Sequence, residues 1–163
     1  MTARSRRTAR ELWAPWMERA RTEAARALLT GDVPVGALVI DASGALLAAA
    51  CNRREHDGDA TAHAEVLAVR DASRSLGRWR LDGCTLVCTL EPCLMCAGAL
   101  LNARLDRLVY GADDARFGAV RSRYAVLDDP RMNHRLEVIR GIDEEACVAQ
   151  LRAFFASLRE PSA

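Results

Sequence analysis

Apolar residues along the chain form two kinds of pattern: helical spacings and short continuous runs. Near the N-terminus an apolar stripe repeats every four residues, at Trp16, Ala20, Ala24 and Leu28. This spacing predicts a helix with Pro15 in its first turn and Gly31 at its C-terminal end. The runs Val35–Ile40 and Leu46–Cys51 flank the turn residues Asp41–Gly44, which predicts two antiparallel strands.

The rest of the chain alternates between helical and β-rich segments, after the polar and irregular stretch Asn52–Thr61. Helices are predicted at His63–Leu76, Pro92–Asn102 and Glu144–Leu158, and strands at Cys84–Leu90, Leu105–Gly111 and Leu136–Ile139. Strands that alternate with helices after a first hairpin indicate an α/β fold, a sheet covered by helices. Ala112–His134 has no long apolar period, and long loops in compact domains are commonly functional.

The composition is that of a globular chain, because half of the residues are apolar and 28% are charged. Its 163 residues suit a single domain over 1–163. The longest uncharged apolar runs, Val33–Ile40 and Gly44–Cys51, are far shorter than the ~20 residues of a membrane span, so we expect no membrane association. With a net charge of +1, any nucleic-acid surface must be a local patch of arginines.

The N-terminal segment Met1–Arg10 carries four arginines and no acidic residue. We expect residues 1 to about 12 to be a flexible basic tail, with an arm that contacts phosphates as the alternative. No secretion signal is recognisable, so we expect a cytoplasmic protein whose six cysteines bind metal or lie buried.

Three residues form a candidate zinc site. Cys93 and Cys96 are three residues apart on a predicted helix and therefore share one face. Cys93 lies at the positive end of that helix, which favours a thiolate, and His63 supplies a nitrogen ligand. Three protein ligands leave an open position for water, which is typical of catalytic rather than structural zinc.

Glu65 is the candidate catalytic residue beside this site. Two thiolates and a neutral imidazole cancel the charge of zinc, so such an ion should acidify its bound water less than an all-histidine site does. A nearby base that takes a proton from this water is therefore useful. The alternative is a structural acid in the first turn of a helix.

The remaining cysteines and histidines have no ligand spacing. Cys84 and Cys88 lie about 13 Å apart on a strand, too far for one ion. They are expected to be core residues, as are Cys51 and Cys147. The isolated His56 and His134 are expected on the surface or in loops.

Longer motifs extend the picture. They are Val33–Ala37, Asn52–Arg53, Thr61–Glu65, Leu90–Ala99, Tyr110–Asp114 and Met132–Arg135. His63-Ala-Glu65 with Pro92-Cys-Leu-Met-Cys96 matches the signature of zinc-dependent nucleobase deaminases. From about Trp16 to Phe155 the sequence resembles the bacterial tRNA-specific adenosine deaminases, the TadA family of the cytidine deaminase-like superfamily.

The resemblance implies a three-layer fold, with a five-stranded mixed sheet flanked by helices, and a homodimer. It implies one Zn²⁺ per chain on His63, Cys93 and Cys96, and Glu65 as proton shuttle. The implied reaction converts the wobble adenosine of a tRNA anticodon stem-loop to inosine, with release of ammonia. Substrate contacts implied by position are Asn52, Asp114 within the stretch 113–118, Phe154, Phe155 and Arg159.

Three alternatives stay open. A free-base or nucleoside deaminase for cytosine, cytidine or guanine shares every zinc residue. A zinc-stabilised interaction module would need a fourth ligand, and a redox Cys-x-x-Cys protein would leave His63 and Glu65 unexplained. The stretch 121–124 and the tail after Leu158 depart from the family pattern, and both Phe154 and Phe155 could be core residues.

Overall fold

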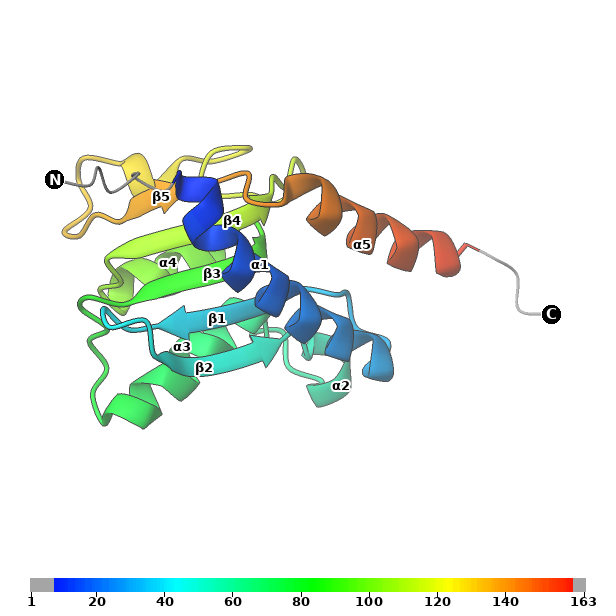
Figure 1. Ribbon diagram of the computed structural model, residues 1–163, viewed down its shortest axis with the longest axis horizontal. Coiled ribbons are helices and arrows are strands. Elements are labelled where there is room, and N and C mark those ends of the chain that lie inside the picture. Colours follow the sequence, from blue (N-terminus) through cyan, green and yellow to red (C-terminus); the bar gives the residue numbers. More distant parts are fainter. Residues whose placement is uncertain (1–7, 160–163) are drawn as a thin grey trace, which may run out of the picture.

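The computed structural model describes residues 8–159, which form a five-stranded sheet with helices on both faces (Figure 1). In spatial order the strands are β2 (Leu46–Cys51), β1 (Gly36–Ile40), β3 (Thr85–Leu90), β4 (Arg107–Ala112) and β5 (Glu137–Ile139). β1 is antiparallel to β2 and β3, whereas β4 is parallel to β3 and β5. The expected five-stranded mixed sheet is confirmed.

The strand register places the two ends of the sheet. Ile40 pairs with Thr85 and Ala37 pairs with Cys88. The turn that starts at Asp41 therefore lies at the end of the sheet opposite the C-terminal ends of β3 and β4.

Helices cover both faces of the sheet, which confirms the three-layer arrangement. They are α1 (Ala9–Ala25), the short α2 (Arg54–Asp57), α3 (Ala64–Leu76), α4 (Leu94–Asn102) and α5 (Glu144–Ser157). Successive strand residues point to opposite faces. Val87 and Val109 pack in one core with α1 and α5, while Leu86 and Leu108 pack in the other with α3 and α4. Figure 1 shows α1 in front of the sheet and α3 and α4 behind it.

The first helix begins earlier than the sequence predicts. The Thr8 hydroxyl accepts a hydrogen bond from the Glu11 amide, and the Glu11 carboxylate accepts one from the Thr8 amide, at 3.2 and 2.8 Å. This capping box starts the helix at Ala9, so Pro15 lies inside it rather than in its first turn. Residues 9–12 of the expected basic tail are helical, and residues 1–7 lie outside the described part. Gly31 ends the segment as predicted, with φ +75°.

The predicted apolar stripe of this helix is partly wrong. Ala20 and Ala24 are fully buried, but Leu28 is 48% exposed and Trp16 is only partly buried. Trp13 and Met17 take their places in the core. Since α1 ends at Ala25 and continues as a 3-10 turn, Leu28 does not follow the α-helical period.

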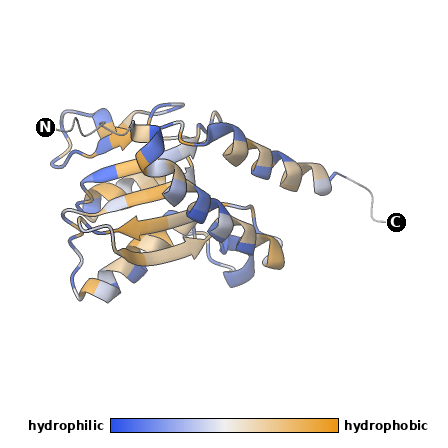
Figure 2. Cartoon of the chain, in the orientation of Figure 1, coloured by the Kyte–Doolittle hydropathy of each residue, from blue (hydrophilic) through white to orange (hydrophobic). Residues whose placement is uncertain are grey.

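The strands are rich in apolar residues, as Figure 2 shows for β1 and β2. All five residues of β1 are buried because both of its faces are covered. No helix in residues 8–159 is long and apolar enough to cross a membrane.

Gly36 permits the contact between α1 and the sheet. A Cβ at this position would lie 2.1 Å from the Ala20 carbonyl oxygen and 2.6 Å from the Ala24 amide nitrogen. We predict that Gly36→Ala lowers the free energy of unfolding by about 3 kcal/mol, because the helix must move away. Denaturant unfolding measures the loss. Gly98→Ala on α4 is the control, because its Cβ would meet nothing within 4 Å. Equal stability of Gly36→Ala and the parent protein would contradict the prediction.

Candidate metal centre

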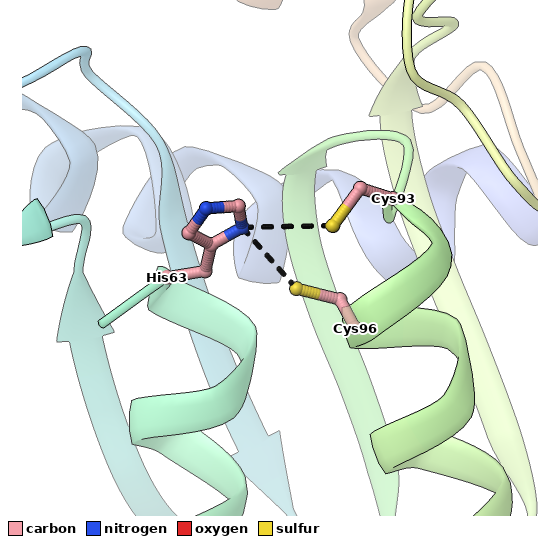
Figure 3. A group of neighbouring side chains, drawn as sticks. All are labelled: His63, Cys93 and Cys96. Atoms are coloured by element: carbon pink, nitrogen blue, oxygen red, sulfur yellow. Dashed lines mark hydrogen bonds between the residues drawn. The ribbon is translucent and has the colours of Figure 1, made fainter. Parts of the chain in front are cut away.

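Two helices begin close together behind the sheet. His63 is the N-cap residue of α3 and Cys93 is the N-cap residue of α4, and both have extended backbone angles. Figure 3 shows both side chains pointing into the space between the two helix starts. The positive ends of two helix dipoles therefore flank the thiols, which favours their ionised form.

Cys96 completes a compact group of three donors. Nδ1 of His63 lies 3.6 Å from Sγ of Cys93 and 3.5 Å from Sγ of Cys96 (Figure 3). All three ligand atoms lie within 4.8 Å of one another. Zinc bonds of about 2.3 Å to sulfur and about 2.0–2.1 Å to nitrogen, at tetrahedral angles, separate the two donors by roughly 3.6 Å. The donor types and spacings therefore fit zinc.

The three ligands of the group hold their protons unequally. A hydrogen bond from the Cys96 thiol lowers the pKa of Cys93 to about 4. The pKa of Cys96 rises because its proton is held in that hydrogen bond, and hydrogen bonding to Cys93 raises the pKa of His63. Cys93 is thus the most readily ionised of the three, whereas Cys96, and His63 where it is protonated, must lose a proton to serve as metal ligands.

Glu65 lies in the first turn of α3 and is 4% exposed. Burial raises its pKa to about 7, and the charges of His63 and Cys93 act on its carboxyl group. Residues two apart on a regular helix point apart, but His63 precedes the helix, so that rule does not separate these two side chains. A carboxyl group with a pKa near neutrality is suited to accept and return a proton.

The other cysteines and histidines are separate from this group. Residues 8–159 contain one set of three or more side chains placed to share an ion, the set above. Cys84, Cys88 and Cys147 are buried free thiols, as expected for core residues, and Cys51 is partly buried. The His134 ring lies 2.6 Å from the Leu105 carbonyl oxygen.

Asn52 follows β2 directly and is partly buried. Its Nδ2 donates to the Val33 carbonyl, and its Oδ1 accepts from the Arg54 amide, both at 3.2 Å. One amide hydrogen and one acceptor position remain for a ligand. The fully buried Asp32 accepts from the Glu55 amide at 2.7 Å and so fixes α2 beside Asn52.

The long loop after β4 adjoins the metal group. A hollow of about 340 Å³ lies beside Cys93. It is lined by Cys93, Leu94, Met95, Arg116, Phe117, Arg123 and Tyr124. The Asp114 side chain accepts from the amides of Arg116 and Phe117, so it shapes this loop.

The predicted contacts on α5 and just after it have different environments. Phe154 is 9% exposed, which favours a packing role, while Phe155 is 44% exposed and meets the Phe154 ring edge-on. Arg159 is exposed and donates to the Phe155 carbonyl at 3.2 Å. α5 extends outward from the sheet (Figure 1).

The sequence pattern assigns no role to Glu91. Its side chain is 2% exposed and accepts hydrogen bonds from backbone amides of the long loop. The available signal was an acidic residue directly between an apolar strand and Pro92.

Known relatives decide the family. Residues 12–112 match the cytidine and deoxycytidylate deaminase zinc-binding region. The tRNA-specific adenosine deaminase of Bacillus subtilis is 43% identical over 145 residues, 89% of each chain. The chain belongs to the tRNA-specific adenosine deaminase family. The family member from Haemophilus influenzae is 44% identical over 130 residues, 80% of this chain and 75% of that protein.

Solved structures of deaminases share the fold of this chain. One from biochemical and structural studies of A-to-I editing by tRNA:A34 deaminases at the wobble position has a TM-score of 0.80 at 40% identity. It covers 83% of this chain and 98% of its own. Guanine deaminase from Nitrosomonas europaea has a TM-score of 0.72 at 28% identity, covering 94% and 87%. The fold is thus shared with small-molecule deaminases, while identity is higher with the tRNA-specific family.

We predict one zinc ion per chain and its loss in the double variant Cys93→Ala, Cys96→Ala. Because both helix starts meet at the ion, chelation should also lower the melting temperature. Elemental analysis and thermal unfolding with and without chelator measure these effects. The double variant Cys84→Ala, Cys88→Ala is the control and should retain zinc. Unchanged zinc in the Cys93, Cys96 variant, or equal melting temperatures, would contradict the prediction.

Proposed function

We propose that the protein deaminates adenosine to inosine at the wobble position of a tRNA anticodon loop and releases ammonia. The observation that best supports this proposal is the group of three metal donors, His63, Cys93 and Cys96, with the buried Glu65 beside it. This group occurs in a chain of the tRNA-specific adenosine deaminase family. A closed four-ligand site would have favoured a structural role for the metal, whereas among residues 8–159 the set placed to share an ion has three members.

Glu65 carries the proton transfers in this proposal. Zinc on His63, Cys93 and Cys96 supplies Lewis-acid activation of water. Glu65 accepts a proton from the water that attacks C6 of adenine and donates it to N1. Glu65 then moves the proton of the new C6 hydroxyl to the amine, so that the C6 carbonyl forms as the C–N bond breaks and one water is consumed for each ammonia released. Its pKa of about 7 allows both directions of transfer near neutral pH.

Substrate contacts surround the metal group. Asn52 has free hydrogen-bonding positions for the nucleoside. Arg116 and Arg123 line the hollow beside Cys93, and neither forms an ion pair within residues 8–159. Arg121, by contrast, pairs with Asp113 at 3.4 Å. Unpaired arginines and exposed aromatic rings suit the phosphates and unstacked bases of a single-stranded loop.

The chain as a whole forms one deaminase domain in this proposal, and Asp114 positions the loop beside the substrate. The remaining proposed RNA contacts are Phe155 on α5 and Arg159 just after it, both exposed, while the nearly buried Phe154 packs against the Phe155 ring. Exposed Leu94 and Met95 near the hollow support a homodimer whose second copy adjoins the site. Six free thiols support a reducing, cytoplasmic environment.

We predict that Glu65→Ala abolishes turnover and leaves zinc binding and the fold intact. Glu65 transfers protons and is not a ligand, so the rate should fall by at least the ~10²–10⁴ usual for one acid–base group. Ammonia release, zinc content and melting temperature measure the three properties. Glu65→Gln is the matched variant of equal size and should be equally inactive. Near-normal turnover in either variant would remove Glu65 from the mechanism.

We predict turnover of an anticodon stem-loop with adenosine at the wobble position, and poor activity on free adenosine, cytidine, cytosine and guanine. Recognition needs the loop, because a net charge of +1 provides no general attraction to RNA. Inosine and ammonia formation measure the preference, with a cytidine stem-loop as control. Comparable activity on any free base or nucleoside would favour the small-molecule alternative.

The arginines of the hollow provide a second arm of this test. Arg116→Ala and Arg123→Ala should raise KM for the stem-loop more than they lower kcat, because phosphate contacts act equally in the ground and transition states. Arg74→Ala is the control, since Arg74 pairs with Asp71 on the exposed side of α3.

A further inference from the structure

Glu91 lies between β3 and the metal ligand Cys93, and its carboxylate collects hydrogen bonds from the long loop. Oε1 accepts from the backbone amides of Val120, Arg121 and Ser122 at 3.2, 2.8 and 2.9 Å. Oε2 accepts from the Asp114 amide at 2.9 Å and from the Ser122 hydroxyl. One buried side chain thus holds both ends of the stretch 114–122.

The same stretch is pressed against the metal-ligand segment. The Ala119 amide donates to the Pro92 carbonyl at 2.8 Å, and Gly118 forms an isolated β-bridge with Cys93. A Cβ on Gly118 would lie 2.3 Å from Oε2 of Glu91. No side chain larger than hydrogen fits there, so the loop backbone lies directly on the carboxylate.

The contacts of Glu91 exclude a proton-transfer role. Five donors occupy a carboxylate that has about four acceptor positions, and the side chain is 2% exposed. Glu91 is therefore a permanent acceptor.

We infer that Glu91 is a positioning residue that fixes the loop 114–122 in the shape needed to bind RNA beside the metal centre. Arg116 and Phe117, which line the hollow, lie within the fixed stretch, and Arg123 follows it. The inference rests on the proposed function, because it assigns this loop to substrate binding. It extends that function by assigning the loop's shape to one carboxylate rather than to the metal ligands.

The test is Glu91→Gln in the full chain. The glutamine amide can keep one oxygen toward Val120–Ser122, but its NH₂ group then faces the Asp114 amide, donor against donor. KM for the wobble-adenosine stem-loop should rise about tenfold or more, as for the loss of one hydrogen bond to a charged group, with a smaller change in kcat. Zinc should remain at one per chain. Backbone amides of residues 114 and 120–122 should exchange hydrogen faster.

Two further variants separate positioning from general stability. Ser122→Ala removes one donor and should shift KM and amide exchange in the same direction by less. Asp41→Asn is the matched control, because the Asp41 carboxylate also accepts hydrogen bonds from two backbone amides, those of Ser43 and Ala45. Its turn lies at the opposite end of the sheet, away from the metal centre. Asp41→Asn should lower stability without raising KM.

Two results would overturn the inference. One is hydrogen exchange at the backbone amides of residues 114 and 120–122 that stays at the parent rate in Ser122→Ala, and also in Glu91→Gln where that variant folds. The other is a lower fraction of active enzyme in Glu91→Gln while KM for the stem-loop stays at the parent value. If the parent protein does not act on the stem-loop, the proposed function fails, while the exchange measurement still tests whether Glu91 fixes the loop.

Discussion

Two thiols and an imidazole converge because two helices begin at the same place. His63 and Cys93 are N-cap residues, so their side chains leave the backbone where the helices begin and the first amides have no partner within the helix. The sheet imposes this meeting, since α3 and α4 both pack on one face of its central strands. The dipoles of both helices then stabilise the negative sulfurs, and the same geometry places Glu65 in a buried position beside them.

Buried carboxylates extend the order of this centre into the loops around it. Asp32 fixes α2 next to Asn52, and Glu91 fixes the loop that contains Arg116. Each replaces the missing ladder bonds of an irregular segment with charge-assisted hydrogen bonds from several backbone amides. The walls around the metal group are therefore held by side chains, while the donors themselves are held by helices.

The sequence predicted the chemistry better than the packing. His63, Glu65, Cys93 and Cys96 belong to short motifs whose geometry is set within one helical turn, and the structure brings the three donors together. The pattern misplaces the start of the first helix because alanine is compatible with either face, and because Pro15 competes as a start signal with the capping box Thr8-x-x-Glu11. The loop shape could not be predicted, since the hydrogen bonds of Glu91 join residues 23 to 31 positions apart.

Three alanines of α3 line the contact between this helix and the sheet, beginning next to the metal ligand His63. Ala64, Ala68 and Ala72 are fully buried against the sheet, with no methylene to rearrange. A helix transmits displacement as a rod, and eight residues span about 12 Å. A larger side chain at Ala72 would tilt α3 and swing His63 away from the two sulfurs. Metal affinity is thereby mechanically linked to packing more than two helical turns away.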